Sequence, residues 1–570
     1  MNEKFKLHYS KMNALSIESL EEMYIPNQEE IKYDYNPFRI TNLQNYNPIY
    51  SEFFALTEKN YNRISFNHKY HIQDLNTVID SDTMTELKRP IFIKYSPLLD
   101  PLRFMIGKYD LMDTKTRTLP TLENDSILKL RTYHNSSYID NFFCYLNSKL
   151  LHSHDVINCL DYYGSFLGIQ EKFKMNIADD LEYVSSSPFF KENLGKLFII
   201  HDDNKYEYKN LGSRSNKLKL NISSNIHALD VIEIDDVLDA KDGIEEIGEL
   251  IYENEKKPSN DNSDNDSSSE SSNNSELNYS SDDDDDDDHD DDDDDDHDDD
   301  HDDDDDDDWE SESSCMSSDD EYISAYINNF PMQMICLEKC DGTLDELFIK
   351  NQINNETGSA ILMQIIMTLL LFQKTFRFTH NDLHTNNIMF IKTDIPFLYY
   401  KFENNVYRVP TYGKIFKIID FGRAIYRFQG KVFCSDSFAP GGDAATQYNC
   451  EPFLNENKPR LDPNYSFDLS RLGTSIYDFV IGDCEDDDMD DFQKTIYRWC
   501  SDDNGKNVLY KKNGDDRYPN FKLYKMISRT VHEHTPENQL NYDYFKQYCV
   551  KSKNTIQEHI IDIDAIPCYA

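Results

Sequence analysis

Length, composition and charge exclude several classes of protein. The chain has 570 residues and a formal net charge of −50, but 34 of its 107 acidic residues lie between Asp261 and Glu321, where there is no Lys or Arg. The other 509 residues hold 73 acidic and 57 basic side chains. An acidic chain repels the phosphates that dominate non-specific binding, so we expect no nucleic acid and no membrane as partner. A hydrophobic content of 38% excludes global disorder.

The sequence lacks the usual marks of export. The first residues, MNEKFKLHYSKMN, contain no apolar run, so no secretory signal is expected, and the longest apolar stretch, Ala360–Phe372, is too short for a bilayer. The 11 cysteines never form a C-x-x-C pair, which fits a reducing compartment better than disulfides or structural zinc. We therefore expect an intracellular, cytoplasmic protein, whose oligomeric state stays open.

Strand and helix patterns alternate in the first part of the chain. Ile91–Tyr95 is predicted to be a strand, because it is apolar and aromatic and opens at Pro90. Apolar side chains at helical spacing, from Ile139 to Leu150, predict a helix. Val156–Phe166 is predicted to be a strand and a turn.

The second part begins with a buried strand over Met332–Glu338 and becomes more helical. We predict the following elements after it: a turn at Asp341-Gly342, a short helix from Leu344 to Phe348, a buried helix over 359–376, strands at Ile388–Ile391 and Ile415–Ile419, and a helix from Leu469 to Phe479. Between the two parts, residues 253–325 are rich in Ser, Asn and Asp and cannot bury a core. We interpret them as a disordered acidic insertion; an acidic decoy, a cation buffer or a phosphorylated tail is the functional alternative.

Two polar motifs carry the chemistry. His380–Asn387, with the sequence HNDLHTNN, lies between the buried helix and the strand at Ile388, and Asp420-Phe421-Gly422 follows the next strand. In this order they resemble the catalytic loop H-R-D-L-x-x-x-N and the D-F-G motif of the protein-kinase superfamily. The alternative is that they are Asp and Asn residues of ordinary turns.

The resemblance implies ATP and Mg²⁺ as cofactors and a role for each motif residue. Asp382 would be catalytic and accept the proton of the substrate hydroxyl, while Asn387 and Asp420 would be metal ligands. Hinge-like residues Glu338 and Cys340 would present their backbone to adenine. The catalytic loop would be supported by two further residues, namely His380 and Asp468, and the segment DLSRLG that starts at Asp468 resembles the family's D-x-W-S-L-G, with Ser470 in place of Trp.

The position of the phosphate-binding lysine has two alternatives. Ile91–Lys94 resembles the V-A-I-K strand, so Lys94 would bind the ATP phosphates and pair with an acid on the next helix, for which Asp140 is the candidate. In a rival alignment, Gly164–Gly168 is a degenerate glycine loop and Lys172 or Lys174 is the strand lysine. Each of these lysines also has the alternative of being an ordinary surface charge.

Several departures from the family pattern leave the substrate class open. No glycine precedes Gly107, so no glycine-rich loop can lie before Lys94. Asn381 replaces the Arg that receives a phosphorylated activation loop, and no A-P-E follows Asp420. His384 replaces the Lys of Ser/Thr kinases, and the segment from His380 to Leu383 is also similar to choline and aminoglycoside phosphotransferases.

We therefore predict an α+β, two-lobed protein-kinase-like fold with an antiparallel, β-rich N-lobe, a mostly helical C-lobe and a disordered acidic insertion. The expected divisions are an N-terminal extension (1–80), the N-lobe (81–200), an N-lobe insertion (201–252), the acidic insertion (253–325), the last strand and hinge (326–344) and the C-lobe (345–570). The predicted function is a Ser/Thr-type protein kinase acting on a protein substrate, with a pseudokinase scaffold or a small-molecule phosphotransferase as alternatives. The chain also resembles divergent kinase-like proteins of giant DNA viruses, the mimivirus group, which implies a viral factory or the virion as its location.

Overall fold

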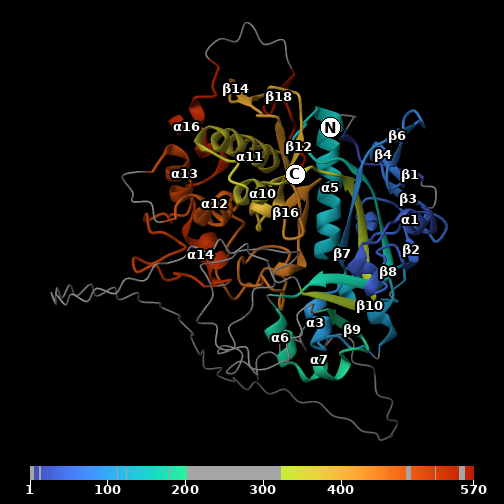
Figure 1. Cartoon of the computed structure of the whole chain (residues 1–570). Helices are drawn as coiled ribbons and strands as arrows, with labels where there is room; N and C mark the ends of the chain where they lie inside the picture. The colour runs from blue at the N-terminus through green and yellow to red at the C-terminus, as the bar shows by residue number, and fades with distance from the viewer. Residues whose placement is uncertain are drawn as a thin grey trace, which may run out of the picture. The chain divides into compact units, whose positions relative to one another are not determined.

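In the computed structural model, the largest sheet has five antiparallel strands (Figure 1). Its hydrogen-bonded order is β2 (Ile40–Gln44), β8 (Tyr162–Asn176), β10 (Ser324–Glu338) and β7 (Ile91–Pro97), with β9 (Phe198–His201) paired to the first residues of β10. Strand β10 lies between β7 and β8, and Lys94 on β7 is opposite Ile335. The predicted strands at Ile91 and Met332 are confirmed, and β10 begins earlier, at Ser324.

The structure describes most of the chain on both sides of the acidic segment. The described residues are 5–11, 15–111, 113–123, 125–178, 180–201, 323–482, 489–519, 521–550 and 559–570. The predictions for 201–252 and for the acidic insertion therefore lie outside the described residues, apart from His201 and Ile323–Ala325.

Helix α5 (Ser136–His154) packs against β8 and β10. It begins where the side chain of Asn135 accepts a hydrogen bond from the N–H of Ser137, and it ends at Asp155, whose φ of +54° is left-handed. The predicted helix is thus confirmed. The strand predicted from Val156 begins only at Tyr162, because a turn closed by the Cys159 N–H and the Val156 carbonyl precedes it.

The first 80 residues, expected to be an extension, contribute to the main sheet through β2, which pairs with β8. Two smaller antiparallel sheets accompany it: β1 (Tyr9–Lys11) with β3 (Ile64–Phe66), and β4 (Tyr70–Asp74), β5 (Thr77–Asp80) and β6 (Glu86–Lys88) in that order. This part of the chain also contains short helices: α1 (Ile17–Met23), α2 (Gln28–Lys32), α3 (Pro101–Met105), α4 (Leu128–Arg131), α6 (Leu181–Ser186) and α7 (Pro188–Asn193).

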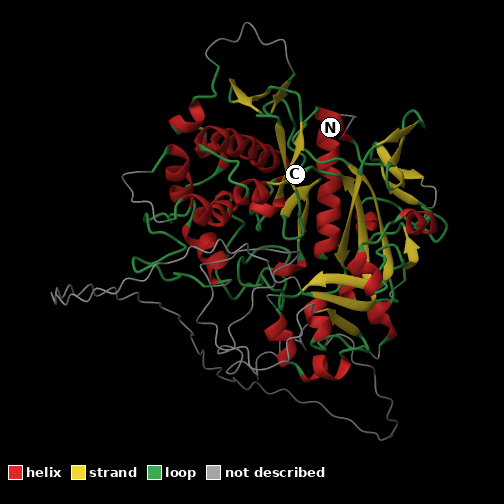
Figure 2. Cartoon of the chain, viewed as in Figure 1, coloured by secondary structure: helices red, strands yellow, loops and turns green. Residues whose placement is uncertain are grey.

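The later part of the chain contains most of the long helices (Figure 2). The helices of this part are α10 (Leu344–Ile349), α11 (Asn355–Phe376), α12 (Phe467–Val480), α13 (Asp491–Trp499), α14 (Lys522–Thr530), α15 (Pro536–Gln539) and α16 (Asp543–Lys546), of which α11 and α12 are the longest. Helix α12 packs against both α13 and α14, and α11 packs against α13. The helices predicted at 344, 359 and 469 are confirmed.

Small sheets accompany these helices. Their strands are β11 (Gly342–Thr343), β12 (Ile388–Lys392) and β15 (Lys414–Ile418); β14 (Asn405–Pro410), β13 (Phe397–Phe402) and β18 (Ile560–Asp562); and β16 (Ile425–Phe428) with β17 (Lys431–Cys434). Gly342, predicted to lie in a turn, pairs with Phe390 as part of β11. The protein therefore has a mixed α+β fold with several antiparallel sheets.

Helix α11 is long and apolar enough, by length and composition alone, to cross a membrane. It has 22 residues, more than the apolar stretch Ala360–Phe372 suggested, but 94% of its apolar window is buried inside the protein. Its N-terminus is closed by a capping box between Asn354 and Thr357, and it ends at Arg377 with a φ of +54°. This burial indicates a core helix.

Candidate active site

Lys94 lies between two carboxylates that come from distant parts of the chain. Its Nζ is 2.7 Å from Oδ2 of Asp140 on α5 and 2.9 Å from Oδ1 of Asp420. Burial opposes a charge on Lys94, but the two carboxylates outweigh it and raise the pKa of Lys94. The structure thus brings the predicted pair of Lys94 and Asp140 together with Asp420, which was predicted from a different motif.

Asp420 is held in position by its backbone and by Asp140. Its φ of +62° is left-handed, which is uncommon for a residue with a side chain. The next N–H, that of Phe421, donates to Oδ1 of Asp140 at 2.9 Å. The buried ring of Phe421 packs 4.6 Å from the ring of Phe143 on α5 and 5.7 Å from that of His380. Asp140 therefore ties α5, Lys94 and the Asp420 segment together.

Asp468, at the start of α12, anchors the segment His380–Asn387. Its two carboxylate oxygens accept hydrogen bonds from the N–H groups of His380 and Asn381, each at 2.9 Å. Nδ2 of Asn387 donates to the Asp382 carbonyl at 2.9 Å. Because this bond uses the amide nitrogen of Asn387, its Oδ1 is the atom left for a cation.

Asp382 lies in a strongly cationic environment. Burial would raise its pKa, but the charges of Arg423, His384 and Arg471 and a hydrogen bond from Tyr524 lower the pKa of Asp382 to about 2. Burial lowers the pKa of His384 to about 4, although the negative charge of Asp382 acts to raise it. His384 is therefore neutral at pH 7, where the positive charge beside Asp382 comes from the two arginines, and it adds its own charge only in acid.

The hinge-like segment offers one backbone donor. The N–H groups of Glu338, Lys339 and Asp341 donate to the carbonyls of Asp161, Pro90 and Phe390, respectively. Among residues 338–341, the N–H of Cys340 is the one without a hydrogen-bond partner in the described chain. The backbone N–H of Glu338 is thus not available to an adenine, whereas its carboxylate holds Nζ of Lys417 at 2.7 Å.

The rival lysines point to other partners. Nζ of Lys172 donates to the carbonyls of Tyr33 and Asp34, and Nζ of Lys174 lies 3.2 Å from Glu29. Both lysines are on β8, where they bind residues near the N-terminus. They do not pair with Asp420 or Asp140.

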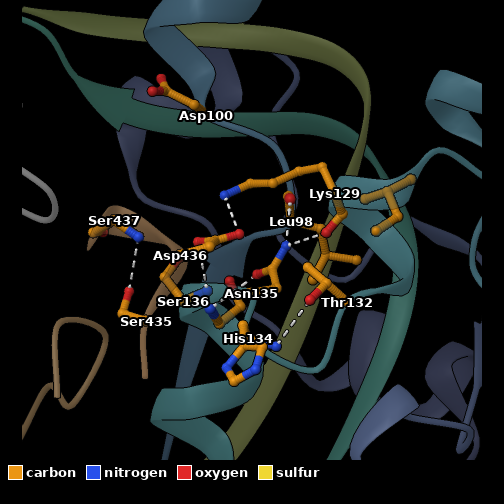
Figure 3. A network of polar contacts seen from close by, with 12 residues as sticks. Leu98, Asp100, Lys129, Thr132, His134, Asn135, Ser136, Ser435, Asp436 and Ser437 are labelled. Atoms are coloured by element: carbon orange, nitrogen blue, oxygen red, sulfur yellow. Dashed lines mark hydrogen bonds and ion pairs between the residues drawn. The ribbon is translucent and has the colours of Figure 1, made fainter. Parts of the chain in front are cut away.

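A polar network joins the start of α5 to the segment after Asp420 (Figure 3). Asp436 accepts hydrogen bonds from Nζ of Lys129 at 2.7 Å and from the N–H of Ser136, the first residue of α5, at 3.1 Å. The N–H of Asp436 donates to the His134 carbonyl at 2.7 Å. A carboxylate at a helix N-terminus satisfies free N–H groups and interacts favourably with the helix dipole. Asp436 therefore fixes the helix that carries Asp140.

We expect that any rate of phosphoryl transfer at this site does not depend on phosphorylation of the segment after Asp420. Asn381 is uncharged and buried, and its side chain already binds Arg423 and Tyr448, so it cannot receive a phosphate. Phosphatase treatment should leave the rate unchanged. Loss of activity after phosphatase treatment would contradict this expectation.

Asp436→Asn should lower the rate about tenfold, because a charge-assisted hydrogen bond at the start of α5 is lost.

Comparisons with known proteins give short, local similarities. No family model matches the chain. A stretch of 179 residues, 30% of the chain, is 30% identical to the uncharacterized protein 098R of Invertebrate iridescent virus 6 and covers 27% of that protein. A stretch of 116 residues, 19% of the chain, is 31% identical to the serine/threonine-protein kinase haspin of Mus musculus and covers 15% of it. The chain thus spans less than a third of either relative.

These similarities support a kinase-like segment and a viral relative. The comparisons give no support to the expected resemblance to the mimivirus group.

Three side chains around Asp382 were not predicted from the sequence, namely Arg423, Arg471 and Tyr524. Arg423 directly follows the Asp420 motif and Arg471 lies within the segment that starts at Asp468, so their positions were a usable signal; Tyr524 lies 142 residues from Asp382 in no recognisable motif.

Proposed function

We propose that the protein is an ATP-dependent protein kinase that transfers the γ-phosphate of ATP to a Ser or Thr hydroxyl of a protein substrate. The observation that carries this proposal is the position of Lys94 between Asp140 and Asp420, close to a catalytic-loop segment anchored by Asp468. A partly buried lysine that bridges two carboxylates provides a cation for phosphates beside an oxygen ligand for a metal. The local similarity to a Ser/Thr kinase agrees with it.

The available donors fit the proposed cofactors. The amide oxygen of Asn387 and the carboxylate of Asp420 are hard ligands of the kind that Mg²⁺ prefers, and Mg²⁺, when bound, would neutralise charge on the phosphates. The N–H of Cys340 would bind the adenine, and Lys94 would hold the α- and β-phosphates. Asp382 would orient the acceptor hydroxyl and take its proton as the oxygen bonds to the γ-phosphorus and ADP leaves.

The direct test is transfer of radiolabelled γ-phosphate from ATP by the purified full-length chain. Protein acceptors of acidic and basic composition, choline and an aminoglycoside should be compared, with Asp382→Ala as the inactive control. Labelling of Ser or Thr in a protein supports the proposal. Labelling of a small molecule alone would favour the phosphotransferase alternative, and no transfer to any acceptor would favour the pseudokinase scaffold.

A viral factory or the virion is the proposed location.

We expect Asp420→Ala to weaken the binding of Mg²⁺-ATP. ATP with Mg²⁺ should raise the melting temperature of the wild type, because a ligand that binds only the folded state stabilises it by about 2.7 kcal/mol at 100 times its Kd. The variant should lose most of this shift, since an oxygen ligand is missing. Asp543→Ala, at a fully exposed carboxylate, is the matched control. An unaltered Mg²⁺-dependent shift would remove Asp420 from the site.

A further inference from the structure

The hydroxyl of Tyr524, on α14, joins a carboxylate to a buried guanidinium. It donates to Oδ1 of Asp382 at 2.7 Å and accepts a hydrogen bond from Nε of Arg471, on α12, at 2.8 Å. Tyr524 is 8% exposed and Arg471 is 1% exposed. A hydroxyl can donate one bond and accept another, so this arrangement uses both of its functions.

We propose that Tyr524 is a positioning residue for phosphoryl transfer: its hydroxyl fixes Oδ1 of Asp382 and leaves Oδ2 for the hydroxyl of the acceptor. This inference rests on the proposed function and concerns the same site. Oδ2 of Asp382 has no hydrogen-bond partner among the residues that the structure describes. A carboxylate fixed through one oxygen retains the other as a base in a defined direction, which favours a reactive geometry.

Arg471 determines which way the Tyr524 proton points. A guanidinium only donates, so Nε of Arg471 needs the oxygen of Tyr524, and the hydroxyl proton is left for Asp382. Nη2 of Arg471 lies 3.9 Å from Oδ1 of Asp382, which is too long for a hydrogen bond. Nη1 and Nη2 have no hydrogen-bond partner in the described chain. The hydroxyl of Tyr524 therefore bridges the buried guanidinium of Arg471 and the partly buried carboxylate of Asp382, which do not bind each other directly.

The alternative is that Tyr524 inhibits phosphoryl transfer, because its hydroxyl occupies the position that the hydroxyl of the acceptor would take. The packing of the ring favours positioning. The ring lies 5.4 Å from that of Phe521 and 6.0 Å from that of Phe467, and the guanidinium groups of Arg471 and Arg423 lie 5.0 and 5.6 Å from its centre. A ring held on several sides is a fixed part of the site.

Tyr524→Phe tests the inference, because it removes the hydroxyl and keeps the ring. We expect kcat to fall about 10- to 100-fold, with the KM for ATP changed less than about twofold, since the contact concerns the base and not the nucleotide. Tyr510→Phe is the matched control: its hydroxyl donates to Asp478, also on α12, at 2.9 Å.

A thermal double-mutant cycle tests the contact without using activity. Tyr524→Phe should lower the melting temperature more in the wild type than in an Asp382→Ala background, where the hydroxyl has lost its acceptor. Equal shifts in both backgrounds would overturn the inference. In the activity assay, wild-type kcat or an increased kcat in Tyr524→Phe would also overturn it, the increase indicating a block. A wild type without any transfer would instead remove the proposed function, and the inference with it.

Discussion

Asp382→Ala is expected to lower the rate of phosphoryl transfer by about 10²- to 10⁴-fold, the usual contribution of a general base. Asp382 is the carboxylate placed among Arg423, Arg471 and Tyr524, and its pKa of about 2 keeps it ionised at every pH at which the protein would work. The rate should be measured with the labelled-phosphate assay on the protein acceptor that the wild type modifies best.

Asp382→Asn separates the chemistry of this side chain from its shape. The amide can still accept the hydrogen bond from Tyr524 but cannot take a proton, so we expect a loss as large as that of Asp382→Ala. Binding of ATP, followed as a shift in melting temperature, should change little in both variants, because Asp382 acts on the acceptor. Wild-type rates in either variant would show that Asp382 is not the base.

Lys94→Met is expected to lower kcat by about 10²-fold or more, because only a cation held at the phosphates aligns them for transfer. The change also leaves the carboxylates of Asp140 and Asp420 without their shared cation. Because Lys94 and Asp420 are only partly buried, the loss of stability should stay below the about 3–5 kcal/mol expected for a fully buried ion pair. Folding should therefore be checked by circular dichroism, and Lys94→Arg should be measured beside it. The arginine retains the charge, so we expect a folded protein with a reduced kcat.

Lys172→Met and Lys174→Met are the controls for this prediction. Both lysines are on the same sheet but bind residues 29–34, so their loss should change kcat less than about twofold. The reverse ranking, with Lys172 or Lys174 more important than Lys94, would move the phosphate-binding site to the rival alignment.

Short-range patterns were enough to predict most of the elements that carry the candidate site. Apolar spacing predicted α5, α11 and α12, and the alternation of apolar runs with polar loops placed Asp382 before β12 and Asp420 after β15. These signals are local, because helix and strand periodicity and turn residues act within a few positions of the chain. The same signals failed at Val156, where a turn delays the strand, and for residues 1–80, where β2 pairs with a strand more than 100 residues away.

The order of the motifs, the chemical types of their residues and the segments on which they lie could therefore be read from the chain without its fold. The pairing of Lys94 with Asp140 was expected from the resemblance. The contacts of Lys94 with Asp420, of Asp436 with the start of α5 and of Tyr524 with Asp382 appear only when the chain is folded. These contacts join residues 142 to 326 positions apart, and they depend on strand pairing and helix packing across the whole core. Neither the charge of a side chain nor its local spacing identifies a partner that lies hundreds of residues away. Burial of apolar faces brings the elements together, and each polar group then forms hydrogen bonds with the neighbours that it meets there.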